Sequence, residues 1–493
     1  MSTKYKITDN HLIFSYDFNE PLNEELIKVI QTVKIITFPR KFNQSIDNLP
    51  EGITHLFFGE SNEEFLFDQP IDHLPTSLTH LILGYNFNHP VDFLPQGLVF
   101  LSFGFNFNKP VDNLPPNITH LNFGQCFNQK VDNLPPGLIH LSFGDCFDQS
   151  IDHLPSSLKY LFFGNWFNHP INNLCVGRKY FDKKKGIVVE EGLVKLSLGC
   201  RFDHPLEFKE ISPEEYVETL TYLCIGSYSN LVTMHHPINF SDFSCNPMSS
   251  NFNHPLNNLP NSITHLFLTG SFDQPINRKN LPHSLTHLAL TGCFNQYIDQ
   301  LPSKTCQKDL KIPGLTHLAL GYSFNKSVKN LPNTLKVLYL GNNFNKGINK
   351  LPDSIEDLQL GDSFNQPITF LPKSLKYLTF GENFNRSIET MCLWLNKNCV
   401  ANPENGLLHL HFGKNFNHLI DNLPNSIKKI TLGWNFCLKI KKFPENLEVI
   451  TIEREYSSHG KLLKEKDVPQ NVKIYHNYEY ISYTDDEGFE HFL

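Results

Sequence analysis

Histidine recurs at one position of a short apolar segment that returns through most of this sequence. If these segments are neighbouring strands, the imidazoles stand about 5 Å apart, which suits ring stacking. Neutral imidazoles also bind transition metals, but a straight row supplies the converging ligands of a zinc site poorly. The residues at this position, which we expect to form a partner-binding face without a metal, are His55, His80, Phe100, His120, His140, Tyr160, Tyr222, His265, His287, His317, Tyr377 and His409.

Aspartate forms a second row, five residues after each of six phenylalanines, at Asp47, Asp72, Asp92, Asp112, Asp132 and Asp152. Stacked carboxylates repel one another unless solvent or a partner screens them. They could face bulk solvent, accept a backbone N–H in their own Asp-x-Leu-Pro turn, or hold Ca²⁺ or basic groups of a partner. Asparagine takes the same place at Asn172 and Asn349, which favours the turn.

Catalytic motifs are absent from the sequence, including Gly-x-Ser-x-Gly, a Walker-type phosphate loop and His-Glu-x-x-His. The carboxylates are periodic, as structural residues are. A polysaccharide-cleaving β-helix is the enzyme alternative, but it requires a local cluster of Asp with Arg or Lys that breaks the repeat. We therefore expect no enzymatic activity and no cofactor.

A repeat anchored on Phe-Asn or Phe-Asp must position these side chains. The spacing is twenty residues at every step from Phe67 to Phe167, and again from Phe324 to Phe384. The eighteen anchors are Phe18, Phe42, Phe67, Phe87, Phe107, Phe127, Phe147, Phe167, Phe202, Phe252, Phe272, Phe294, Phe324, Phe344, Phe364, Phe384, Phe416 and Phe436.

Each repeat predicts one short strand. Ile118, Leu121 and Phe123 alternate with polar residues at the end of their segment, so they should point into a core while His120 points outward. A glycine such as Gly144 follows most strands, where the chain must bend, and Leu-Pro aims it into the next strand. Stacked units of this kind give a parallel sheet with a continuous core behind it.

The pattern resembles the leucine-rich repeat, with its polar ninth position at residues such as Asn86, Asn106, Cys126 and Cys146, which we expect to face inward as free thiols or amides. It resembles the FNIP repeat family still more closely, through elements such as Phe87-Asn-His-Pro-Val and Phe364-Asn-Gln-Pro-Ile. The resemblance, which runs from about residue 18 to 450, implies a source in social amoebae or in giant viruses that infect amoebae. Many viral members carry an N-terminal F-box, but only seventeen residues precede Phe18.

We predict a β-rich, leucine-rich-repeat-like solenoid with a parallel sheet on one face and short turns or extended segments on the other. Its parts are an N-terminal lead-in (1–17), the repeat solenoid (18–452) and a C-terminal cap and tail (453–493). Insertions at 175–192, 303–312 and 391–406 fall at one point of the coil, and loops at 60–66 and 227–250 fall at another. The stretch 175–250 is the least regular.

Composition limits the function. The net charge is −8 and no basic stripe exists, so we expect no nucleic-acid binding. A signal peptide and a membrane span are both lacking, and eleven cysteines in such a chain indicate free thiols in a cytoplasm, that of the host if the protein is viral.

The expected function is non-enzymatic binding of a protein partner through the sheet face and the insertion loops, in a host-interaction or ubiquitin-ligase-adaptor-like role. A glycan-binding solenoid and a self-assembling structural solenoid are the alternatives. The partner's identity and the oligomeric state stay open.

Overall fold

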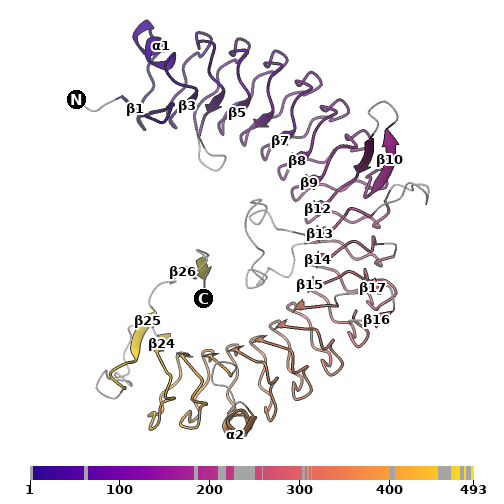
Figure 1. Ribbon diagram of the computed structural model, residues 1–493, viewed down its shortest axis with the longest axis vertical. Helices are drawn as coiled ribbons and strands as arrows, with labels where there is room; N and C mark the ends of the chain where they lie inside the picture. Colours follow the sequence, from indigo (N-terminus) through magenta and orange to yellow (C-terminus); the bar gives the residue numbers. More distant parts are fainter. Residues whose placement is uncertain are drawn as a thin grey trace. The chain divides into compact units, whose positions relative to one another are not determined.

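The computed structural model describes residues 4–59, 65–182, 187–208, 218–226, 250–257, 259–302, 306–307, 310–311, 314–398, 406–453, 468–477, 482–484 and 490–492. The chain forms two compact units, which are treated separately: unit 1 is Met1–His236 with Ser249–Ile263, and unit 2 is Pro237–Met248 with Thr264–Leu493. Within each unit, short coils lie side by side and contribute one strand apiece to a sheet (Figure 1). The predicted leucine-rich-repeat-like solenoid is confirmed.

Unit 1 begins with an antiparallel pair, β1 (Tyr5–Thr8) and β2 (His11–Phe14), followed by helix α1 (Glu24–Ile30). From β2 onward, each strand pairs in parallel with the next one of the coil stack. These strands are β3 (Ile35–Thr37), β4 (His55–Phe57), β5 (His80–Ile82), β6 (Phe100–Ser102), β7 (His120–Asn122), β8 (His140–Ser142), β9 (Tyr160–Phe162), β12 (Lys195–Leu198) and β13 (Tyr222–Ile225).

Unit 2 repeats the arrangement, again with parallel pairing of successive strands. Its strands are β14 (His265–Leu268), β15 (His287–Leu290), β18 (His317–Leu320), β19 (Val337–Leu340), β20 (Asp357–Leu360), β21 (Tyr377–Thr379), β22 (His409–His411), β23 (Lys429–Leu432), β24 (Val449–Glu453) and β25 (Lys473–Asn477). A separate antiparallel pair, β26 (Ser482–Thr484) and β27 (Glu490–Phe492), lies near the C-terminus of the chain.

The core of each coil follows the expected alternation. In the coil of β7, Ile118, Leu121 and Phe123 are buried. The second residue of each strand of the coil stack from β3 to β24, the insertion hairpins aside, is equally buried. Proline fixes the entry into the strand, because its carbonyl accepts the N–H three residues later, as from Ile118 to Pro115. The strand therefore starts at the same point of each coil, which keeps the register.

The anchor phenylalanines form a stacked spine behind the sheet. Successive rings lie 5.9–6.4 Å apart, from Phe18 to Phe252 in unit 1 and from Phe272 to Phe436 in unit 2. All eighteen rings are buried. One aromatic position, repeated in every coil, thus supplies a large share of the core and explains the phenylalanine-rich composition.

The three insertions between the Leu-Pro turn and the strand form small elements of their own. Two are antiparallel hairpins, β10 (Arg178–Asp182) with β11 (Ile187–Glu191), and β16 (Cys306–Gln307) with β17 (Leu310–Lys311). The third contains helix α2 (Glu389–Asn398). Each lies on the side of its own unit away from the sheet (Figure 1). Residues 60–64 and 227–249 of the two other loops lie outside the described residues.

Candidate partner-binding face

The first residues of strands β4 to β9 lie on one face of the sheet and form a column of rings in unit 1. His55, His80, Phe100, His120, His140 and Tyr160 are register partners on successive strands β4 to β9. The rings of the first pair lie 4.2 Å apart, and those that follow lie 5.8–6.1 Å apart. We call these six residues the ring column.

The other predicted face residues are also first residues of strands, but the structure separates some of them. Lys195 lies between Tyr160 and Tyr222 in the register. In unit 2, His265, His287 and His317 stack at 4.1 Å, and Val337 and Asp357 then precede Tyr377 and His409. The interrupting residues were missed because we selected by residue type. The signal was present, since Lys195 and Asp357 each begin the same x-Leu-x-Leu-Gly segment.

A threonine before most of the histidines sets the protonation of the ring. The Thr79 hydroxyl donates its one hydrogen to the carbonyl of Thr54, at 3.0 Å, and lies 2.9 Å from Nδ1 of His80. That hydroxyl oxygen can only accept from the ring, so the neutral imidazole carries its hydrogen on Nδ1 and a lone pair on Nε2. The same pairing holds His55, His120, His265, His287 and His317.

Burial favours the neutral form of several histidines in these stacks. Burial lowers the pKa of His55 and His80, and neighbouring imidazoles lower the pKa of His80 further. Burial lowers the pKa of His287 to about 3 and that of His317 to about 4. A partner therefore meets neutral rings at these four positions.

His140 differs from the other histidines because Ile139 takes the place of the threonine. Its ring is 5% exposed and its Nδ1 has no hydrogen-bond partner. Burial lowers the pKa of His140 to about 4. Acid must therefore protonate this histidine more easily in the unfolded chain than in the fold.

We expect the free energy of unfolding to decrease as the pH is lowered from about 6.5 to about 4, the window between the unfolded and folded pKa of His140. His140→Phe introduces the residue type that already stands at Phe100 in the same column. This substitution should reduce the decrease in the free energy of unfolding by about 2–3 kcal/mol. Urea unfolding of both proteins at pH 7 and pH 4.5 measures the difference. If the free energy of unfolding decreased equally in the two proteins, His140 would not be a source of the pH dependence.

The aspartate row is exposed, and its carboxylates accept from side chains of the next coil or, at Asp47 and Asp152, from a serine hydroxyl two residues earlier. Asp92 and Asp112 each accept from the side-chain amide of an asparagine in the next coil, at 3.0 and 3.2 Å. No Asp carboxylate of the row accepts an N–H of its own turn in the described residues, so that interpretation is wrong. Exposure to solvent and the amide contacts together relieve the repulsion.

The ninth position was expected to face inward, and this was wrong as well. Cys126 and Cys146 are only half-buried, and Asn106 donates to Asn86 at 3.0 Å along the edge of the stack. Amide groups can pair here without being enclosed in the core.

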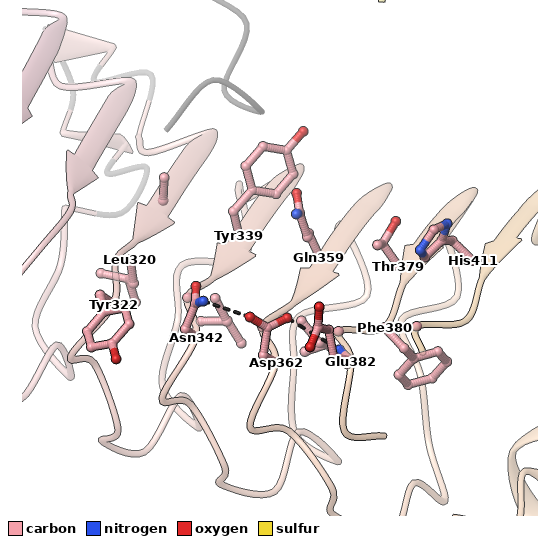
Figure 2. Close-up of a pocket in the computed structure, with 18 of the residues that line it drawn as sticks. Leu320, Tyr322, Tyr339, Asn342, Gln359, Asp362, Thr379, Phe380, Glu382 and His411 are labelled. Atoms are coloured by element: carbon pink, nitrogen blue, oxygen red, sulfur yellow. Dashed lines mark hydrogen bonds between the residues drawn. The ribbon is translucent and has the colours of Figure 1, made fainter. Parts of the chain in front are cut away.

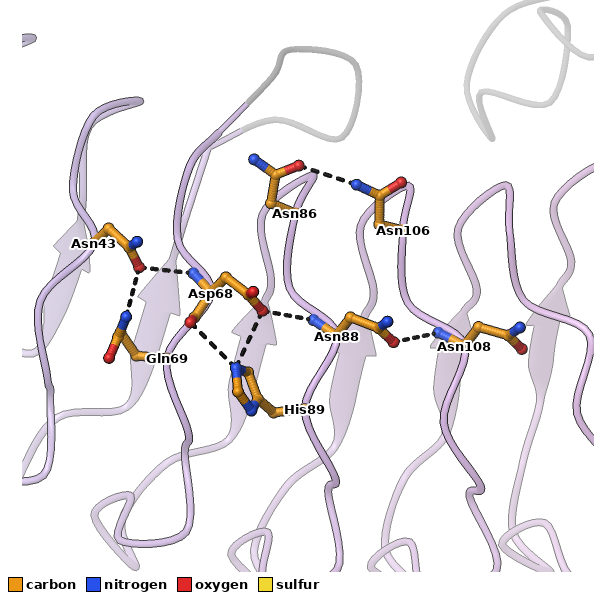
Figure 3. A network of polar contacts seen from close by, with 8 residues as sticks. All are labelled: Asn43, Asp68, Gln69, Asn86, Asn88, His89, Asn106 and Asn108. Atoms are coloured by element: carbon orange, nitrogen blue, oxygen red, sulfur yellow. Dashed lines mark hydrogen bonds and ion pairs between the residues drawn. The ribbon is translucent and has the colours of Figure 1, made fainter.

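The residues directly after the anchor phenylalanines form a ladder of hydrogen bonds between coils. In the sequence, these residues served only to align the repeats. Its side-chain oxygen accepts the backbone N–H of the equivalent residue in the next coil, as from Asp68 to Asn43, Asn88 to Asp68 and Asn108 to Asn88, at 2.9–3.1 Å (Figure 3). The ladder continues through Asn128, Asp148 and Asn168 to Asp203 in unit 1, and from Asp273 to Cys437 in unit 2. An acceptor is required, which is why Asn and Asp alternate freely.

Asn108→Ala should lower the free energy of unfolding by about 1–2 kcal/mol, because Asn128 N–H and the Gln129 amide both lose their acceptor, at 3.0 Å each. Asn108→Asp keeps the acceptor and is the matched control, with an expected change below about 0.5 kcal/mol. Chemical denaturation measures both. Equal losses would show that the ladder does not act through its acceptor.

Among the residues that the structure describes, no group of three or more His, Cys, Asp or Glu side chains could hold a metal ion. Neither described helix has the length and apolarity that crossing a bilayer requires.

Comparison with known proteins gives related repeats. A family model described as FNIP Repeat matches residues 67–106, 107–146, 127–166, 252–293, 294–343, 324–363, 344–383, 364–393 and 405–435. The crystal structure of CroV588, a giant-virus protein described as a novel circular LRR protein, is 31% identical with a TM-score of 0.67, covering 97% of this chain and 72% of that one. YopM from Yersinia enterocolitica WA-314 is 17% identical with a TM-score of 0.40, covering 90% and 87%. No curated protein matches the sequence significantly.

Proposed function

The chain belongs to the FNIP repeat family, and from this premise we propose that it is a non-enzymatic scaffold that binds a protein partner through its sheet face and insertion loops. Leucine-rich-type solenoids are typical protein-interaction modules, because stacked coils present a long continuous surface. The ring column carries the proposal: six aromatic or imidazole side chains stand in register on one face of unit 1. Large, rigid rings of this kind dominate binding energies at protein interfaces.

We place the protein in the cytoplasm, that of the host if it is viral. Described cysteines such as Cys126, Cys146 and Cys392 are free thiols, which fits a reducing compartment. A host-interaction or ubiquitin-ligase-adaptor-like role would use the same face.

The test is affinity purification of the tagged chain from amoeba lysate, with quantitative mass spectrometry. Replacing Phe100, His120 and Tyr160 together by alanine should reduce the amount of retained partner at least about tenfold, since each truncation of a central ring costs about 1 kcal/mol or more. Phe93→Ala, at an exposed turn away from the sheet, is the control and should retain the partner. Retention that the triple variant leaves unchanged would contradict the proposal, as would the absence of any enriched protein. Recovery of ubiquitin-ligase subunits would support the adaptor role.

A further inference from the structure

Two rows of polar side chains border a groove in unit 2 (Figure 2). The strand row consists of the third residues of β19 to β22, Tyr339, Gln359, Thr379 and His411. The glycine row consists of the residues that follow the strand-end glycines of the same coils, Asn342, Asp362, Glu382 and Lys414. The space between the rows has a volume of about 730 Å³.

The strand row differs from the preceding coils of unit 2. The third residues of the three preceding strands are Phe267, Ala289 and Ala319, and all three are buried. In unit 1, the residues after two of the strand-end glycines are Tyr85 and Phe105, whose rings stack at 4.6 Å. Coil stacking does not fix these two positions, because they are apolar or aromatic in one coil of unit 1, at Ile82 and Tyr85, and polar in another, at Asn122 and Gln125.

Glycines form the floor of the groove. A Cβ atom on Gly361 would lie 2.2 Å from the carbonyl oxygen of Gly341, and one on Gly381 would lie 2.4 Å from the carbonyl carbon of Gly361. The floor therefore cannot carry side chains. The space between the rows stays open along four coils.

The walls offer donors and acceptors in a fixed arrangement. Asn342 donates to Asp362 at 2.7 Å, and Asp362 also accepts the backbone N–H of Glu382 at 3.3 Å. Gln359 and Glu382 are exposed, so their amide and carboxylate groups face solvent. The Lys414 ammonium lies over the ring of Trp434, 5.2 Å from its centre. Hydroxyl, amide and charged groups of this kind can both donate to and accept from a ligand.

Aromatic rings stand at the two ends of the glycine row. Tyr322 precedes Asn342 by one coil and Trp434 follows Lys414 by one coil, and both border the groove. The two rings are 44% and 43% exposed. A site with hydrogen-bonding walls and exposed aromatic ends suits a polar ligand that also has apolar C–H faces.

The spacing between adjacent coils favours some linear ligands over others. Adjacent coils repeat at about 4.8 Å, whereas side chains on one face of an extended peptide repeat at about 6.6 Å, so a peptide loses register within a few coils. Nucleic acid is disfavoured by Asp362 and Glu382, which repel phosphates. A sugar unit of an extended β-1,4-linked glycan has nearly the length of one coil step, and its hydroxyls donate and accept on both edges.

We propose that this groove of unit 2 binds a linear β-1,4-linked glycan, with about one sugar unit per coil. The strand row and the glycine row would hydrogen-bond the hydroxyls on the two edges of the chain. The site uses none of the ring column, and its test is independent of the proposed protein partner.

The experiment is isothermal titration of the full chain with cellohexaose and with chitohexaose at up to millimolar concentration. We expect one of the two to bind, and Gln359→Ala combined with Glu382→Ala to weaken that binding about tenfold or more through the lost hydrogen bonds. Lys346→Ala, at an exposed turn of the coils that form the groove, is the control and should bind as the unmodified chain does. Circular dichroism of each variant confirms that the fold is retained.

Absence of binding by both hexasaccharides would overturn the proposal. So would binding that the double variant leaves unchanged, because the ligand would then lie elsewhere. A basic peptide that binds the groove more tightly than either hexasaccharide would also overturn it.

Discussion

Gly144→Ala is expected to lower the free energy of unfolding by about 3 kcal/mol or more, although it adds a single methyl group. A Cβ atom at this position would lie 2.2 Å from the carbonyl oxygen of Gly124 and 2.4 Å from Cα of Gln125. Both contacts are to backbone, so no side-chain rotation relieves them, and the coils must separate. Urea unfolding of the full chain measures the loss.

Gly347→Ala is the matched control, because nothing lies within 4 Å of the Cβ atom it adds. It should leave stability unchanged or raise it by about 0.5 kcal/mol, since alanine has less freedom in the unfolded chain. If Gly144→Ala were as mild as this control, the close stacking of the strand-end glycines would not limit stability.

The strand-end glycines show how much of the fold could be predicted from the sequence. The repeat predicts where strands lie and which side chains enter the core, because alternation and spacing are local properties. The bend of the chain after its strand explains why position 59 is a glycine, since Gly59 has a φ of +80°. At Gly144 the reason is the approach of the neighbouring coil, which depends on a distance between residues twenty positions apart and leaves no local signal.

The candidate face was predicted in part for the same reason. Placing His120 and His140 on one surface needed only the repeat. That Thr119 orients the first ring, while Ile139 leaves the second unpartnered, depends on a carbonyl of the preceding coil and on burial. The groove in unit 2 likewise combines residues such as Gln359 and Glu382, which become neighbours only once the strand register is known.

Phe107→Ala should lower the free energy of unfolding by about 3–5 kcal/mol. The Phe107 ring is fully buried, lies 3.7 Å from that of Phe103, and stacks on the rings of Phe87 and Phe127 at 6.1 and 6.0 Å. Its loss opens a cavity in the middle of the spine. Because a coil contacts only its neighbours, those neighbours have no other core to compensate.

Phe93→Ala separates this effect from the general loss of an aromatic side chain. Phe93 is 71% exposed in the adjoining coil, so its truncation should change stability by about 0.5 kcal/mol or less. Chemical denaturation of both variants should therefore give a large difference between two substitutions of identical chemistry. If both had the same small effect, the spine could not be the main source of stability, and the recurrence of phenylalanine would need another cause.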